Sequence, residues 1–131
     1  MDALIWHNPR CGSSRNALAM IRHAGIEPDV VEYLKQVPGI DELQVMIAAA
    51  GLSVREAIRS KEPAYTEQGL DDPGLSDAQL LAAMVATPVL INRPFVRTAK
   101  GAALCRPPER VLELLPPLPS PFTKENGDVV G

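Results

Sequence analysis

The first 34 residues follow the order strand, loop, helix and strand, and this order constrains the fold more than any other feature. Residues 3–6 are apolar and lead into His-Asn-Pro, where Pro9 favours an extended loop. Apolar residues then recur at helical spacing over residues 17–24, and Gly25 is a typical C-terminal stop. Residues 30–34 have the composition of a second strand. The segment therefore predicts a βαβ unit, whose first loop follows the carboxyl end of a strand.

Capping signals predict helices in the middle of the chain. Three pairs have the spacing of an N-cap and its third helical residue: Gly39 with Glu42, Ser53 with Glu56, and Ser76 with Gln79. We expect the first helix to end before Gly51, the second to run through Arg59 and the third through Val85. Two prolines and two glycines in residues 62–74 indicate a loop.

The last third returns to strands, which we expect at residues 89–91, 95–98 and 102–105, the last two forming a hairpin. Pro107 and Pro108 fit the first turn of a closing helix. The whole predicts one α/β domain over residues 1–115, a βαβ...ββα core with a helical insertion at about residues 39–87. The proline-rich tail, residues 116–131, is expected to be extended or mobile.

Composition narrows the classes of function. A chain of 131 residues with 46% hydrophobic residues is long enough for one core. Its net charge of −3 argues against binding nucleic acid or a membrane surface. It has no apolar run of about 18 residues and no secretory signal pattern, so we expect a cytoplasmic protein. Its two cysteines lack the spacing of a zinc site, so no metal is expected.

Cys11 is the strongest candidate for chemistry. A thiol at a helix N-terminus or near cations has a lowered pKa, and only the thiolate is a good nucleophile. Cys11 is followed by Gly12, Ser13 and Ser14, and either serine is a candidate hydrogen-bond donor to the sulfur. Nearby charge comes from His7, Arg10 and Arg15. The alternative interpretation, a small buried cysteine with solvated arginines around it, remains open at this point.

Spacing excludes two other cysteine chemistries. The cysteine phosphatase loop needs an arginine six positions after the cysteine, and that position holds Ala17. A dithiol redox motif needs a second cysteine three positions on, and that position holds Ser14. An external thiol must therefore resolve any adduct that Cys11 forms.

Five segments occur in this order along the chain: HNPRCGSSRNAL, SVREAIR, PVLINRP, ALCRPPERVLELL and FTKENG. Together they resemble the landmarks of the glutaredoxin-coupled arsenate reductases, from His7 nearly to the C-terminus. The resemblance implies a thioredoxin-like fold with a helical insertion. It implies that Cys11 is the nucleophile, that His7 tunes the thiolate, and that three arginines bind the oxyanion: Arg59, Arg93 and Arg106. It also places a cis proline, Pro94, opposite the nucleophile.

The resemblance further implies reduction of arsenate to arsenite through a Cys11 thiol–arsenate adduct, with a role in arsenic detoxification. Glutathione is then the co-substrate, glutaredoxin clears the resulting mixed disulfide, and no bound cofactor is needed. Arginine suits such a substrate because its planar fork matches the oxygens of an oxyanion. Cys105 is expected to pack inward as a strand residue.

Two alternatives stay open. The first is a partner-binding module of the same fold without enzymatic activity, like the transcription regulators that share this scaffold. Such regulators usually carry a two-cysteine redox switch, and here Ser14 stands at the position of the second cysteine. The second is a monothiol reductase acting on another oxyanion or on glutathione-linked substrates, which charge alone does not separate from arsenate reduction.

Overall fold

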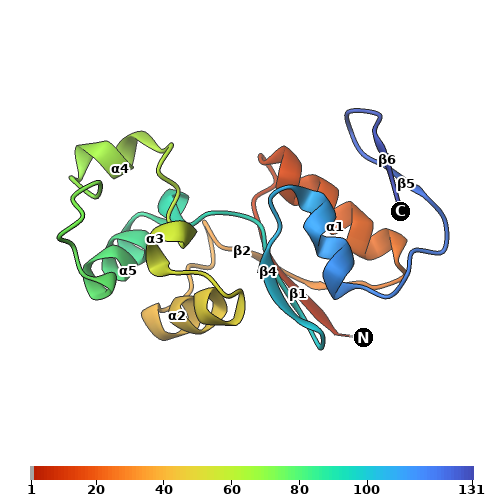
Figure 1. The fold of residues 1–131 in the computed structure, drawn as a ribbon, viewed down its shortest axis with the longest axis horizontal. Helices are drawn as coiled ribbons and strands as arrows, with labels where there is room; N and C mark the ends of the chain where they lie inside the picture. Colours follow the sequence, from red (N-terminus) through yellow and green to blue (C-terminus); the bar gives the residue numbers. More distant parts are fainter. Residues whose placement is uncertain (1) are drawn as a thin grey trace. The chain divides into compact units, whose positions relative to one another are not determined.

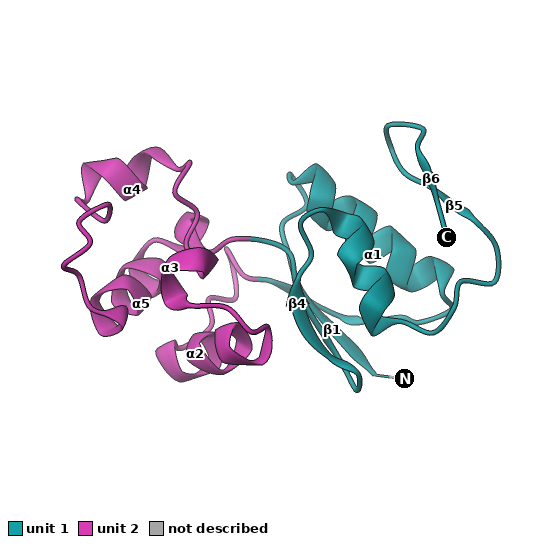
Figure 2. Cartoon of the chain, in the orientation of Figure 1, with its two compact units in different colours: residues 1–32, 93–131 teal, residues 33–92 magenta. Residues whose placement is uncertain are grey.

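The computed structural model describes residues 2–131 and divides the chain into two compact units (Figures 1 and 2). The first unit comprises residues 1–32 together with 93–131, so the two ends of the chain share one core. The second unit is the intervening segment Tyr33–Asn92, which contains the whole of the expected helical insertion.

A four-stranded sheet forms the centre of the first unit, in the order β2-β1-β3-β4. Its strands are β1 (Ala3–His7), β2 (Asp29–Glu32), β3 (Phe95–Thr98) and β4 (Gly101–Leu104). β1 pairs in parallel with β2, while β3 is antiparallel to both β1 and β4. The β3–β4 hairpin is therefore confirmed, and it lies beside the first strand of the chain.

Helix α1 (Gly12–His23) connects β1 to β2, which confirms the predicted βαβ unit. The helix ends where Gly25 takes φ of +86°, a conformation that side chains disfavour. Apolar side chains of α1 pack on one face of the sheet, among them Met20 and Ile21, which are fully buried. This core holds α1, and with it the loop that precedes the helix, against the sheet.

A short 3-10 helix, η2 (Pro108–Leu114), takes the place of the expected closing helix and packs into the same core through Val111 and Leu114. Pro107 is its N-cap and Pro108 its first residue. Both prolines thus lie at the helix start as expected, where the missing amide hydrogen of a proline costs no hydrogen bond.

The second unit is helical. Its elements are α2 (Ile40–Ala49), α3 (Val54–Ala57), α4 (Pro63–Glu67), α5 (Asp77–Ala86) and the 3-10 helix η1 (Pro88–Leu90). The hydroxyls of Ser53 and Ser76 accept hydrogen bonds from the amides of Glu56 and Gln79, so both predicted capping boxes are confirmed.

Three local predictions in this unit are wrong. Residues 62–74 are not all loop, because Pro63 begins the short helix α4, where a proline costs no hydrogen bond. Residues 89–91 are not a strand, because Pro88 begins η1 and only Ile91 pairs, in an isolated bridge to Ile58. That bridge pulls Ile58 into extended conformation, which ends α3 at Ala57 rather than at Arg59.

The C-terminal segment is more ordered than its proline content predicts. It forms a small antiparallel hairpin of β5 (Phe122–Thr123) and β6 (Val129–Val130), drawn at the blue end of the chain in Figure 1. The hairpin is tied to the rest of the first unit by an ion pair of 2.8 Å between Lys124 and Glu109. The tail therefore has defined neighbours.

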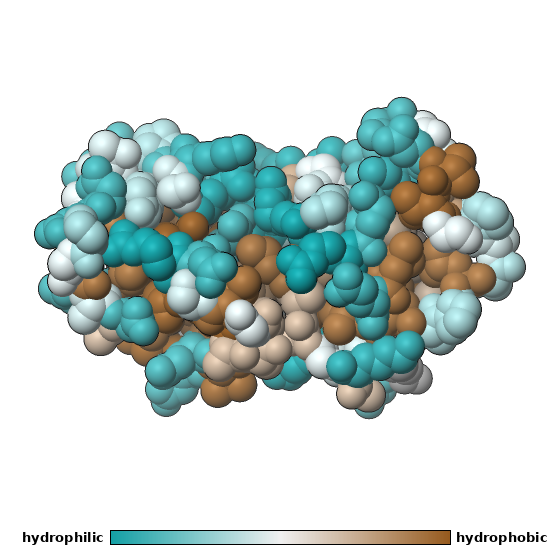
Figure 3. Space-filling view, in the orientation of Figure 1, coloured by the Kyte–Doolittle hydropathy of each residue, from teal (hydrophilic) through white to brown (hydrophobic). Residues whose placement is uncertain are grey.

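On the face drawn in Figure 3, hydrophilic residues surround smaller groups of apolar ones. The exposed large apolar side chains include Val45 in the second unit and Val129 in the C-terminal hairpin. No helix within residues 2–131 has both the length and the apolar character needed to cross a membrane.

Candidate active site

Cys11 is the N-cap of α1, at the end of the loop that follows β1. Its amide donates a hydrogen bond of 3.0 Å to the carbonyl of Asn8, and its own carbonyl accepts one of 3.0 Å from the amide of Arg15. The residue is only partly buried. Its backbone is thus fixed on both sides, while part of the residue's surface stays exposed.

Two arginines from distant parts of the chain meet at this sulfur. The Nη1 of Arg106 lies 3.6 Å from the Sγ of Cys11, and the same nitrogen donates to the carbonyl of Arg93 at 3.1 Å. The Arg93 side chain also hydrogen-bonds the sulfur. Arg93 lies two residues before β3 and Arg106 two residues after β4, so the β3–β4 hairpin carries both cations to the start of α1. The Arg93–Pro94 and Arg106–Pro107 peptide bonds are both cis.

The pKa of the Cys11 thiol lies below its ordinary value. Burial acts to raise this pKa, but it is outweighed by a hydrogen bond from the backbone of Ser14, by the side chains of Arg93 and Arg106, and by the charge of Arg93. Every one of these groups stabilises the thiolate more than the thiol. The site therefore favours the nucleophilic form of the sulfur.

Ser14 serves the site through two different groups. Its backbone amide bonds the sulfur of Cys11, whereas its buried hydroxyl lies 2.6 Å from the Nδ1 of His7 and accepts the amide of Asn8 at 3.0 Å. The expectation that a serine hydroxyl would reach the sulfur is therefore wrong for Ser14, because this hydroxyl is already engaged behind the loop. It joins β1 to the start of α1 instead.

His7 is buried and its pKa is lowered. Burial is the main cause; the Glu32 carboxylate acts to raise the pKa, and Arg22 and Arg15 act to lower it. The ring is consequently neutral at pH 7. Any influence of His7 on the thiolate passes through its contact with Ser14 rather than through a positive charge.

Arg59 lies in the second unit, two residues after α3. Its amide donates to the carbonyl of Leu90 at 2.7 Å, and its Nε donates to Glu62 at 3.1 Å. The structure brings together Cys11, Arg93 and Arg106, which all belong to the first unit. Because the relative positions of the two units are not determined, it does not place Arg59 relative to Cys11.

Cys105 is fully buried in the core of the first unit. Burial raises the pKa of its thiol to about 12, while Arg110 acts to lower it and Glu113 to raise it. At neutral pH it is a packed thiol and not a nucleophile.

Within residues 2–131, no group of three or more His, Cys, Asp or Glu side chains is arranged to hold a metal ion.

Sequence reasoning missed two contributors to the loop. Asn8 accepts the amide of Arg10 with its side chain at 3.0 Å, a turn that the Asn-Pro pair signals in hindsight. Arg15, expected only as nearby charge, forms an ion pair of 2.9 Å with Glu125 in the C-terminal hairpin. No local pattern signals that second contact, because the partners are 110 residues apart.

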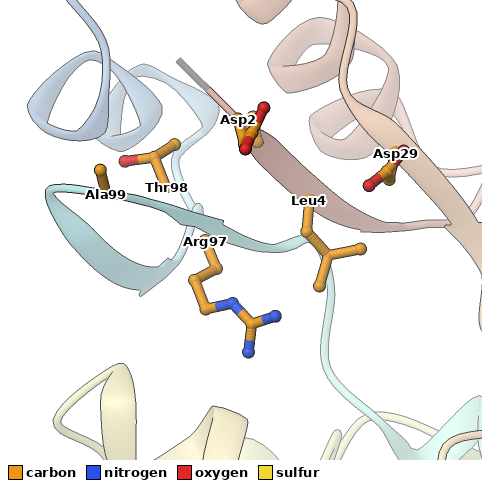
Figure 4. Close-up of a pocket in the computed structure, with 7 residues that line it drawn as sticks. Asp2, Leu4, Asp29, Arg97, Thr98 and Ala99 are labelled. Carbon is orange, nitrogen blue, oxygen red and sulfur yellow. The ribbon is translucent and has the colours of Figure 1, made fainter.

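A separate cavity of about 380 Å³ lies at the other end of β1 (Figure 4). Its lining includes Asp2, Asp29 and Arg97, together with Leu4 and Thr98. None of the predicted site residues contributes to it, so it is not the place where Cys11 acts.

The chain is similar to known proteins over most of its length. A model described as the ArsC family matches residues 6–114, which include Cys11, Arg93 and Arg106. The arsenate reductase of Rhizobium meliloti (strain 1021) is 59% identical over 131 residues, covering 99% of this chain and 94% of the relative. An arsenate reductase of Escherichia coli is 50% identical over 127 residues, covering 96% and 90%.

Among solved structures, the arsenate reductase from Vibrio cholerae superposes with a TM-score of 0.85 at 45% identity, covering 88% of this chain and 98% of that one. The thioredoxin-like α/β fold expected from the sequence is thereby confirmed. The family match spans most of the residues, and the two named relatives align over 94% and 90% of their own lengths. The chain therefore belongs to the ArsC family.

Proposed function

We propose that this protein is an arsenate reductase, an oxidoreductase in which the Cys11 thiolate attacks the arsenic of arsenate. The observation that carries the proposal is the meeting of Arg93 and Arg106 at the sulfur of Cys11. Two cations around one thiolate suit a reaction between that thiolate and an anion, because they offset the repulsion between two negative reactants. The family relatives named arsenate reductase support the same choice of substrate.

Arsenate binding falls to the arginines in this proposal. A guanidinium donates two parallel hydrogen bonds to neighbouring oxygens of a tetrahedral anion, and each charge-assisted bond is worth about 1.5 to 3 kcal/mol. Arg59 is proposed as the third such residue. Its Nε is occupied by Glu62, and its amide is held by Leu90, an arrangement that leaves the forked end of the side chain for a ligand.

The proposed first step forms a bond between the Cys11 sulfur and arsenic and expels one oxygen as water after protonation. Arsenic stays in its pentavalent state, so no electrons have moved. A glutathione thiolate then attacks the Cys11 sulfur, and the electron pair of the sulfur–arsenic bond passes to arsenic. Arsenite leaves, and Cys11 remains in a disulfide with glutathione. The two electrons that reduce arsenic come from the two sulfurs.

The proposed last step is removal of glutathione by glutaredoxin, which regenerates the Cys11 thiolate. The support for an external thiol is that Ser14 stands where a dithiol motif has its second cysteine. Cys105 does not replace it, because a fully buried thiol with a pKa of about 12 supplies almost no thiolate at pH 7.

A coupled assay tests this function. Purified protein is supplied with arsenate, glutathione, glutaredoxin, glutathione reductase and NADPH, and NADPH oxidation is followed after leaving out each component. The expected result is turnover that needs both glutathione and glutaredoxin. Sustained turnover with thioredoxin alone contradicts the monothiol route. Turnover that prefers another reducible oxyanion contradicts the choice of arsenate, and no turnover with any thiol system favours a binding module.

A further inference from the structure

Every nitrogen of the Arg15 guanidinium is committed to a protein partner. Its Nε and Nη2 donate to the two carboxylate oxygens of Glu125 at 2.9 and 3.0 Å, and its Nη1 donates to the carbonyl of Pro9 at 2.9 Å. Pro9 lies between Asn8 and Cys11 in the loop that carries the nucleophile. A single side chain thus joins the C-terminal hairpin to that loop.

Glu125 is itself held in place from several sides. Its amide donates to the side chain of Asn16 at 3.1 Å, directly beside Arg15 on α1. The neighbouring Lys124 is anchored by its ion pair with Glu109 and by a backbone hydrogen bond of 2.8 Å to Asp128. The carboxylate is therefore presented to Arg15 by a fixed turn and not by a loose end of the chain.

We infer that Glu125 is a positioning residue for the nucleophile: through Arg15 it fixes the Pro9 carbonyl, and with it the loop conformation that presents the Cys11 sulfur to its hydrogen-bond donors. The inference rests on the proposed function only in naming Cys11 as the nucleophile. It assigns the C-terminal hairpin a part in the active site, although its residues do not touch the sulfur.

Arg15 differs from Arg93 and Arg106 in this respect. Those two side chains direct hydrogen-bond donors at the sulfur, whereas the three hydrogen bonds of the Arg15 guanidinium go to Glu125 and Pro9. Arg15 and Glu125 are both exposed, with side-chain exposures of 43% and 51%, and exposed ion pairs contribute little to stability. Because the pair is bidentate, it fixes the orientation of the Arg15 guanidinium and so of the Pro9 carbonyl that this guanidinium holds. Loss of the ion pair is expected to leave the fold intact.

The Cys11 thiol pKa separates positioning from plain electrostatics. If the pair acts only by charge, Glu125→Gln lowers this pKa by removing a negative group, and Arg15→Gln raises it by removing a positive one. If the pair holds the loop, both variants raise the pKa, because the sulfur then spends less time beside the amide of Ser14 and the arginines. We expect a rise of about half a unit or more in both variants, which is a roughly threefold fall in the ratio of thiolate to thiol.

The measurement follows thiolate absorbance against pH in about 0.5 M salt, where charge effects between exposed groups are largely screened. Amide hydrogen exchange at Cys11 serves as a second readout, since its hydrogen bond to Asn8 closes the same loop. Exchange is expected to accelerate in both variants while the far-ultraviolet circular dichroism spectrum and melting temperature stay near those of the wild type.

Two further variants complete the test. Glu125→Asp keeps the charge but shortens the reach, so positioning predicts a partial rise in the thiol pKa and a charge effect predicts none. Glu27→Gln removes a different exposed carboxylate, the ion-pair partner of Arg22, without touching Arg15, and the thiol pKa is expected to stay unchanged. Opposite shifts in Glu125→Gln and Arg15→Gln, or an equal rise in Glu27→Gln, would overturn the inference. None of these readouts uses arsenate, so failure of the inference is distinct from failure of the proposed function.

Discussion

Arg106 reaches across 95 positions of the sequence to place its Nη1 3.6 Å from the Sγ of Cys11. The same nitrogen also donates to the carbonyl of Arg93, so the guanidinium is oriented by the backbone before any substrate arrives. A donor that is already aligned costs little further ordering when the anion binds. In the proposed function, this one side chain therefore both stabilises the thiolate and contributes to the anion site.

Replacing Arg106 with Ala should therefore cost activity more than stability. The kcat/KM for arsenate is expected to fall about ten- to a hundredfold, which corresponds to one lost charge-assisted hydrogen bond. The free energy of unfolding should change by about 1 kcal/mol or less, because the side chain is partly exposed. Arg106→Lys should recover part of the activity, since it keeps the charge without the planar fork.

Arg97→Ala is the matched control for this series. Arg97 is an exposed arginine on β3 that lines the distant cavity and not the site of Cys11. Its replacement should leave kcat/KM near the wild-type value. Parallel losses of melting temperature and activity in the Arg106 variants would indicate a structural role instead of anion binding.

The Cys11 thiol should titrate below the usual cysteine pKa of about 8.5. The reason is that the amide of Ser14 and the two arginines stabilise the thiolate by more than burial destabilises it. The rate of alkylation by iodoacetamide, measured from pH 5 to about pH 10, gives the midpoint. A midpoint at or above the usual value would mean that the surroundings of the sulfur do not favour its charged form.

Local signals were enough to predict helix α1 and the position of Cys11 at its start. Pro9, the apolar spacing of α1 and Gly25 all act within a few residues, and the structure agrees with each of them. Ser14 marks the limit of such reasoning. Its type and spacing indicate a donor near the sulfur, but only the geometry of the helix start decides that the amide, and not the hydroxyl, takes this role.

Features that depend on residues distant in the chain could not be predicted from local sequence patterns. Residues 89–91 look like a strand by composition, yet Pro88 and the bridge from Ile91 to Ile58 decide their conformation. The C-terminal segment has the prolines of an extended tail, yet it forms a hairpin that distant contacts, such as the ion pair between Lys124 and Glu109, tie to the first unit. Such contacts form only once the chain has folded, and no local sequence pattern indicates them.

His7 should make the protein less stable in mild acid. Its pKa in the folded state lies below the unfolded value of about 6.5, so the unfolded chain binds more protons as pH falls through that value. Stability from this residue is fully present above about pH 6.5 and is lost towards the lower folded pKa. Urea unfolding from pH 7.5 down to about pH 5 measures the slope.

The control is His7→Asn, which retains a polar group near the position of Nδ1 without a titrating ring. This variant is expected to be less stable at pH 7 but to lose less stability on acidification than the wild type. An equal slope in both proteins would show that other groups, such as carboxylates, account for the whole effect.

Cys105→Ala should retain most of the arsenate reductase activity, because the thiol is fully buried and its pKa is about 12. Alanine is preferred to serine here, since an unpartnered hydroxyl in this core would itself be destabilising by about 1 to 3 kcal/mol. Cys11→Ser in the same assay should abolish turnover. Equal losses in the two variants would contradict the assignment of Cys11 as the single reacting thiol.

The most direct measurement is the mass of the protein after one incomplete cycle. The Cys105→Ala and wild-type proteins are incubated without oxygen with arsenate and glutathione, with glutaredoxin omitted, and the Cys11 peptide is then identified by mass spectrometry. Both proteins are expected to accumulate one glutathione on Cys11, and only when arsenate is present. A disulfide between Cys11 and Cys105, or glutathione on Cys11 without arsenate, would contradict this expectation.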